Sequence, residues 1–360
     1  MLDLKAHLKQ LVEAHAPSGH EGPLRAILQD AWRDLTDEMQ QDGLGSLIGI
    51  KRATQTTTPA RKIMLAAHMD EIGMMVRDIV DGFIYVHRIS GIDNRVMVAQ
   101  PVMVHGKQPL PGIVAAIPPH LSNTSERQKY PTFDELVIDV GLPPAEVAEL
   151  VQIGDLVTVD VPLLELQGKR VAAKAFDDRA CVAAITVCLD TLKTMQHQWD
   201  VYATATVQEE TGLLGAKTAA FTIEPDIAIA LDVCFAEQPG IDQDDSVKMG
   251  EGPGLGIGPN FHTKLIEKIK EVASYHEMKL QDDLIPGASG TDAWAIQVSR
   301  GGIPTLLLEV PIRNMHSPVE TLELTDIDRA GRLMAYFIAS LDADFMAAID
   351  WDDLKEGASA

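Results

Sequence analysis

Five short segments of this chain each end an apolar, strand-like run with a carboxylate or an imidazole. The segments are Ala66–Asp70, Ala175–Arg179, Val207–Thr211, Ala230–Val233 and Asn314–Ser317. Because ligands bind beyond the carboxyl ends of strands in open α/β sheets, this repetition predicts one polar site at the edge of a single sheet. Nitrogen and oxygen donors without cysteine suit zinc, manganese or cobalt, which activate water. The pattern is therefore typical of a metallohydrolase.

Length and charge limit what such a chain can be. Its 360 residues are enough for a large core and predict two domains, and 46% apolar with 23% charged residues is typical of a globular protein. The formal net charge of −23 argues against nucleic-acid binding, which requires a basic surface. No uncharged apolar run reaches the ~18 residues that a membrane span requires, so no membrane partner is expected.

The cysteines and the N-terminal sequence indicate the compartment. Cys181, Cys188 and Cys234 are odd in number and lack metal-ligand spacing, so no disulfide framework is expected. The N-terminal residues lack a basic region followed by a long apolar stretch, which argues against a signal peptide. We therefore expect a cytoplasmic protein.

Alternating strand and helix patterns predict an α/β fold, with a mixed sheet flanked by helices, over residues 1–70 and 167–345. Within the first part, Ser18 and Glu21 have the spacing of a helix-capping box. Residues 71–166 differ: they hold short β-rich runs, Val96–Val98 among them, between Gly, Pro and Asn residues. This segment is expected to be an inserted small β-barrel or PDZ-like domain. It contains a polar loop from Pro118 to Pro131, and residues 346–360 form an acidic tail.

The spacing within two segments suggests how the chemistry is divided. His68 and Asp70 are two residues apart, so on a strand both side chains face one way, as in a metal-bound imidazole that donates to a carboxylate. Glu209 and Glu210 are adjacent and point to different sides, so one can bind metal while the other accepts a proton from water. Solvent-facing strand ends, or acids at a helix N-terminus, are the alternative interpretations.

The other three segments are weaker signals when taken alone. Asp177 and Asp178 precede a helix, where one suffices as an N-cap and the second is free to bridge metals. Asp232 closes the apolar run Ile227–Leu231, where an unpaired carboxylate would be costly and a cation would compensate it. His316 follows a strand, a position where a structural histidine is also common.

Together these segments resemble the glutamyl-aminopeptidase/TET family of dinuclear metallo-aminopeptidases, some of whose members carry the name endoglucanase M. The matching stretches are His68–Gly73, Phe176–Arg179, Ala205–Glu210 with Gly212 and Gly215, Leu231–Asp232, Gly290–Ala293, His316–Ser317, Pro17–Gly19 and Pro118–Leu121. The resemblance spans roughly residues 15 to 340.

The resemblance implies a role for each residue. His68 and Asp232 would bind one divalent ion, Glu210 and His316 a second, and Asp177 would bridge the two. Glu209 would be the general base, and Asp70 would orient His68. The family relationship also implies two zinc ions, with cobalt or manganese as alternatives. The substrates would be short peptides with a free N-terminus. The inserted segment would mediate dimerisation, with further assembly into a tetrahedral dodecamer.

Three other functions compete with an aminopeptidase. A related co-catalytic deacylase or carboxypeptidase would use the same metal pair. A glycosidase would need two carboxyls on opposite sides of a sugar ring, for which the adjacent Glu209 and Glu210 are poorly placed. A metal-binding scaffold without catalysis is the remaining alternative.

Overall fold

The computed structural model describes residues 2–56, 58–118 and 130–349, and its centre is an eight-stranded sheet. In spatial order, the strands are β1 (Glu38–Gln41), β2 (Leu47–Lys51), β12 (Asp200–Thr206), β3 (Lys62–His68), β13 (Ile227–Phe235), β16 (Thr305–Ile312), β14 (Gly254–Ile257) and β15 (Gln281–Leu284). The middle strands β12, β3, β13 and β16 are parallel, while β2 and β14 run antiparallel to their inner neighbours. The carboxyl ends of four strands therefore meet at one edge.

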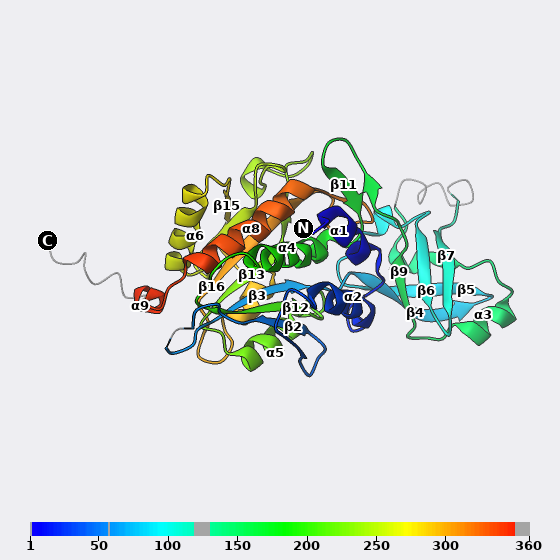
Figure 1. Cartoon of the computed structure of the whole chain (residues 1–360). Coiled ribbons are helices and arrows are strands. Elements are labelled where there is room, and N and C mark those ends of the chain that lie inside the picture. The colour runs from blue at the N-terminus through cyan, green and yellow to red at the C-terminus, as the bar shows by residue number, and fades with distance from the viewer. Residues whose placement is uncertain (1, 57, 119–129, 350–360) are drawn as a thin grey trace.

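Helices cover both faces of this sheet, as Figure 1 shows. One face packs against α1 (Leu4–Glu13), α2 (Gly22–Trp32), α4 (Phe176–Leu192), α6 (Thr263–Tyr275) and α8 (Leu324–Ser340). The other packs against α5 (Leu214–Ile223) and α7 (Asp292–Ile296). The buried residues of α8 include Ile327, Ala330, Met334 and Ile338, whose spacing places them on one side of the helix. Short elements η3 (Gln243–Asp245) and α9 (Phe345–Ala348) complete this part.

A closed six-stranded barrel stands beside the sheet and has its own apolar core. Its strands are β4 (Gly73–Val80), β5 (Phe83–Ile89), β6 (Pro101–His105), β7 (Pro109–Ala115), β8 (Val137–Asp139) and β9 (Leu156–Val159), accompanied by η1 (Asn94–Val96), η2 (Phe133–Glu135) and α3 (Pro144–Leu150). Burial alternates along β7, as expected for a strand with one face inward. In Figure 1 the barrel and α9 lie at opposite ends of the molecule.

A small sheet and a buried ion cluster join the two parts. The sheet consists of β10 (Leu164–Glu165), β11 (Arg170–Ala173) and β17 (Glu320–Glu323). Glu71, just before the barrel, lies 2.6 Å from the Lys174 ammonium and 3.2 Å from the Arg179 guanidinium. All three side chains are at most 5% exposed, so each buried charge is compensated by a neighbour.

The predicted fold class is confirmed, while three local predictions are wrong. Val96–Val98 is not a strand: a 3₁₀ turn over Asn94–Val96 ends there, and the Asp93 side chain accepts from Arg95 N–H. Ser18 and Glu21 form no capping box, because the Ser18 hydroxyl and the Glu21 carboxylate bond to other groups. Asp232 does not close its strand, since β13 continues to Phe235.

Two sequence predictions fall mainly outside the described residues. Most of the polar loop expected between Pro118 and Pro131 lies there, as does most of the acidic tail 346–360. Within the described ranges, no helix combines the length and the apolar character that crossing a membrane requires.

Candidate metal centre

The predicted site residues converge at the carboxyl edge of the parallel strands. His68 is the last residue of β3, Asp232 lies within β13, Glu209 and Glu210 follow β12, His316 follows β16, and Asp177 lies in the first turn of α4. Asp177 and Asp178 have non-helical backbone angles, and neither caps the helix, whose N-cap is Ala175. Their carboxylates are thus not used for capping.

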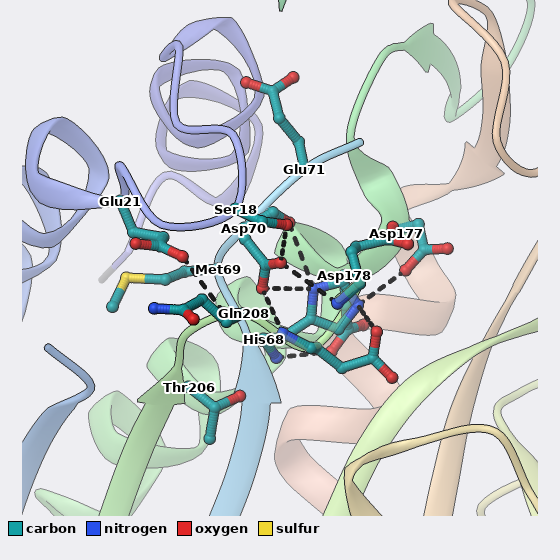
Figure 2. A network of polar contacts seen from close by, with 12 residues as sticks. Ser18, Glu21, His68, Met69, Asp70, Glu71, Asp177, Asp178, Thr206 and Gln208 are labelled. Carbon is teal, nitrogen blue, oxygen red and sulfur yellow. Dashed lines mark hydrogen bonds and ion pairs between the residues drawn. The ribbon is translucent and has the colours of Figure 1, made fainter. Parts of the chain in front are cut away.

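Asp70 fixes the orientation of the His68 imidazole. Its Oδ1 lies 3.4 Å from His68 Nδ1 and also accepts the backbone N–H of Glu209 at 3.0 Å. Its Oδ2 accepts the Ser18 hydroxyl at 2.6 Å and the Glu210 N–H at 3.2 Å. Figure 2 shows Ser18, Asp70 and His68 grouped together, with the Glu71 side chain turned away. Asp70 therefore holds both the imidazole and the turn that carries the two glutamates.

Asp177 places one carboxylate between two imidazoles. Its Oδ1 is 3.0 Å from Nε2 of His68, and its Oδ2 is 3.2 Å from Nε2 of His316. Glu210 Oε1 lies 3.6 Å from the same His316 nitrogen, and Glu209 Oε2 lies 3.9 Å from His68 Nε2. The donor atoms around His68 and those around His316 therefore have Asp177 in common.

Donor atoms gather on both sides of His68. One atom each from His68, Asp178 and Asp232 lie within 4.8 Å of one another, and the same holds for His68, Asp177 and Glu210. Asp178, one of the two acids that the sequence offers as a helix cap or a bridging ligand, accepts the backbone N–H of His68 with its Oδ2 at 3.2 Å.

The carboxylates outnumber the available positive groups. Burial raises the pKa of Asp232 well above its usual value, and it raises the pKa of Glu209 to about 10 and that of Glu210 to about 7. The hydrogen bond to Asp177 raises the pKa of His316 to about 9. For His68, burial opposes the charge, but hydrogen bonds to Asp177 and Asp70 outweigh it and raise the pKa. Buried ionisable groups that shift one another's pKa values in this way are typical of functional sites.

The donor set fits a pair of divalent cations. Every candidate ligand atom is an imidazole nitrogen or a carboxylate oxygen, the types preferred by zinc, manganese and cobalt. Asp178 Oδ1 and Glu210 Oε1 are buried and have no hydrogen-bond partner among the described residues. Unpaired buried carboxylate oxygens are costly, and a cation would compensate them.

The barrel also contributes to this site. Ser90, directly after β5, donates its hydroxyl to Glu210 Oε2 at 2.6 Å. A Cβ on the next residue, Gly91, would lie 2.6 Å from Nδ1 of His316, so only a glycine fits beneath that ring. Both Ser90 and His316 adopt left-handed backbone conformations, with φ of 63° and 58°, which are uncommon for these residue types. The loop after β5 therefore packs directly on the donor cluster.

The donor cluster opens into a cleft of about 690 Å³. Its walls come from segments far apart in the chain. Besides the donor residues they include Ser90, Gly212, Leu213, Phe235, Asp245, Asp283–Ile285, Ser289–Thr291, Glu309 and Met315. A cleft of this size holds a small ligand and leaves its reacting group beside the donors.

A family model agrees with this geometry: the M42 glutamyl aminopeptidase model matches residues 45–333. The chain belongs to the M42 family. The lysyl aminopeptidase of Pyrococcus furiosus is 35% identical over 340 residues, covering 93% of this chain and 96% of that protein.

Solved structures agree with the family assignment. A TET aminopeptidase from a marine sediment thaumarchaeote is 33% identical, with a TM-score of 0.90 and coverage of 96% and 99% of the two chains. The TET1 peptidase of Pyrococcus horikoshii, described as assembling into a tetrahedron or an octahedral shell, is 30% identical, with a TM-score of 0.81 and coverage of 94% and 100%. This M42 protein is a metallo-aminopeptidase.

All seven residues singled out from sequence lie in or against this one cluster. Three residues that contact it are not indicated by the sequence: Ser90 and Gly91 of the barrel, and Glu320 of β17. Glu320 accepts the backbone N–H groups of Asp177 at 3.1 Å and His316 at 2.9 Å. The sequence marks Ser18 as a capping candidate and as part of the matching stretch Pro17–Gly19, and it marks Asp178 as one of two acids of which one could cap the helix. Nothing local in the sequence marks Glu320 or Gly91.

Proposed function

We propose that this M42 enzyme is a dinuclear metal-dependent aminopeptidase that removes N-terminal residues from short peptides. The observation that carries the proposal is the position of Asp177, whose two oxygens face the imidazoles of His68 and His316 at 3.0 and 3.2 Å. A carboxylate so placed is suited to two cations, one beside each histidine.

We assign the ligands as the family resemblance implies, and the contacts of His68, Asp177, Glu210 and His316 support the assignment. His68 and Asp232 would hold one ion, Glu210 and His316 the other, and Asp177 both. Zinc is the proposed metal, with cobalt or manganese as alternatives, because the ligands are imidazoles and carboxylates. Asp70 would keep His68 in the orientation that the ion requires.

When bound, the two ions supply an activated water and stabilise the negative charge that develops on the substrate carbonyl. Glu209 is the proposed general base. Its side chain is 9% exposed and lies within 4 Å of His68, yet it is not needed in the ligand set. With two cations bound nearby the raised pKa of Glu209 would fall, and its carboxylate would take a proton from the attacking water and return it to the leaving amine.

Three further proposals concern the context of the reaction. The cleft of about 690 Å³ matches a short peptide better than a folded protein. We divide the chain into a catalytic part, residues 1–70 and 167–345, and a barrel, residues 71–166, that serves dimerisation. By analogy with a similar TET1 structure described as a dodecamer, dimers would assemble further into a dodecamer. Buried free thiols at all three cysteines fit a reducing cytoplasm.

The test combines substrate chemistry with metal analysis. Peptides with free and acetylated N-termini are compared with purified enzyme and added zinc, cobalt or manganese. Cleavage should require the free amine and two ions per chain, and Asp177→Ala should lose both ions. Cleavage of acetylated peptides would point to another hydrolase of this type. Retention of two ions by Asp177→Ala would refute the bridging role.

A further inference from the structure

A second acidic group lies in the cleft, outside the proposed ligand set. One atom each from Cys234, Asp283 and Glu309 lie within 4.8 Å of one another. Glu309 is 3% exposed, and its Oε2 has no hydrogen-bond partner among the described residues. We call these three residues the acidic recess.

Strand register explains how the recess forms beside the metal centre. Asp232 of β13 pairs with Glu309 of β16, so their side chains share one face of the sheet, about 4.8 Å apart. Cys234 lies two residues beyond Asp232 on that same face. On the other side of Glu309, β14 presents glycine at Gly254 and Gly256, which pair with Glu309 and Asp283 respectively.

Gly254 keeps the space beside Cys234 and Glu309 open. A Cβ on Gly254 would lie 3.1 Å from Cys234 Sγ and 3.3 Å from Glu309 Oε2. Leu284 and Ile285 line the same cleft and add apolar surface. None of the described residues that line the cleft is a lysine or an arginine. Burial and the neighbouring Asp283 raise the pKa of Glu309 well above its usual value, and a cation placed beside the two acids would compensate their charge.

We propose that the acidic recess binds the cationic side chain of the substrate's first residue and so selects lysine or arginine. This inference rests on the proposed aminopeptidase function. A residue whose scissile bond lies at the metal centre must place its side chain in the adjoining cleft. Lysine carries its ammonium on a four-carbon stem, long enough to cross one strand spacing and reach Glu309. The stem then contacts Ile285, which follows Asp283 by two residues.

The test measures kcat/KM of the metal-loaded enzyme for lysyl, arginyl, norleucyl and glutamyl anilides. Norleucine matches the lysine stem but lacks the ammonium. The lysine-to-norleucine ratio should exceed about 30, and Glu309→Gln should lower this ratio at least about 30-fold. Asp283→Asn should lower the same lysine-to-norleucine ratio roughly 10-fold. Because Asp283 lies on a less buried edge strand, this variant still tests the recess if Glu309→Gln fails to fold. Asp282→Asn is the matched control, because Asp282 pairs with Lys270 at 2.7 Å on the opposite face of β15.

The outcomes separate this inference from the proposed function. Norleucine cleaved as well as lysine, with the ratio unchanged in Glu309→Gln and Asp283→Asn, would overturn the recess but leave the aminopeptidase intact. No cleavage of any anilide would count against the proposed function itself. The metal content of the wild type and of both variants is measured as well. A third ion in the wild type, lost in both variants without any change in the ratio, would identify the recess as a metal site and overturn the inference.

Discussion

The Ser18 hydroxyl donates a 2.6 Å hydrogen bond to Oδ2 of Asp70. This contact ties the segment between α1 and α2 to the end of β3. It leaves Oδ1 of Asp70 facing the His68 imidazole. The geometry of the metal centre therefore depends on a residue 52 positions upstream of Asp70.

Replacement of Asp70 by asparagine should reduce metal affinity or kcat by roughly 10- to 100-fold. The amide keeps one acceptor but turns its NH₂ toward backbone N–H groups that the carboxylate now accepts. Ser18→Ala, which removes one bond and keeps the carboxylate, should cost less. Metal titration and steady-state kinetics of both variants provide the measurement. Equal losses would show that Ser18 does more than position Asp70.

Glu209→Gln should retain near wild-type metal content and lose roughly 10²–10⁴-fold in kcat, because the amide cannot accept the proton from water. Glu210→Gln is the comparison, since Glu210 is a proposed ligand and its replacement should release metal. Mass-spectrometric metal analysis alongside kinetics distinguishes them. Loss of metal in Glu209→Gln to the same extent would make Glu209 a ligand instead of a base.

Gly91→Ala should displace His316, because the new methyl carbon would lie 2.6 Å from Nδ1 and 3.1 Å from Cε1 of that ring. We expect at least roughly 10-fold weaker metal binding, as for other disturbances around a metal ligand. Gly43→Ala is the control, since a Cβ there meets no atom within 4 Å. An unchanged metal affinity in Gly91→Ala would mean that the loop after β5 moves to accommodate the methyl group without displacing His316.

Glu71→Ala should lower the free energy of unfolding by about 3–5 kcal/mol, because it leaves the Lys174 and Arg179 charges buried without their carboxylate. Glu165→Ala, which breaks the exposed 2.9 Å pair with Lys5, should change it by less than about 1 kcal/mol. Denaturant unfolding of metal-free protein provides both values. Similar small changes in the two variants would argue that Lys174 loses its proton on mutation.

His7 should make the protein less stable in acid. Burial lowers its pKa from 6.5 to about 4, so between these values the unfolded chain binds a proton that the folded chain does not. Stability therefore falls as pH falls from about 6.5 to 4, by up to about 3 kcal/mol. His7→Gln should show a shallower decline over this range in EDTA-treated protein. Parallel pH profiles for the two proteins would contradict the assignment.

The convergence of the candidate ligands could be predicted from the sequence because its signals are local. Each ligand follows an apolar run, and the parallel strands bring those ends to one edge without further information. The errors are also local in origin. Ser18 and Glu21 have the correct spacing for a capping box, but α2 begins at Gly22-Pro23, and the Glu21 carboxylate accepts instead from Gly19 and Gln208.

Contacts between the barrel and the sheet could not be predicted in this way. Ser90 and Gly91 have ordinary turn-forming residue types, and their importance arises only when the barrel is placed against His316 and Glu210. The acidic recess is similar. Gly254 and Asp283 belong to strands at the far edge of the sheet, and only the register of β14 and β15 places them beside Glu309.

The loop after β5 limits how the barrel can be exchanged, both in protein engineering and in evolution. A foreign barrel grafted onto this sheet would have to supply a hydroxyl at the position of Ser90 and a glycine at the position of Gly91. Otherwise the His316 ring, which packs on this loop, would shift. The barrel and the sheet have separate cores, yet substitutions in one restrict those tolerated in the other, so the two parts are expected to diverge together.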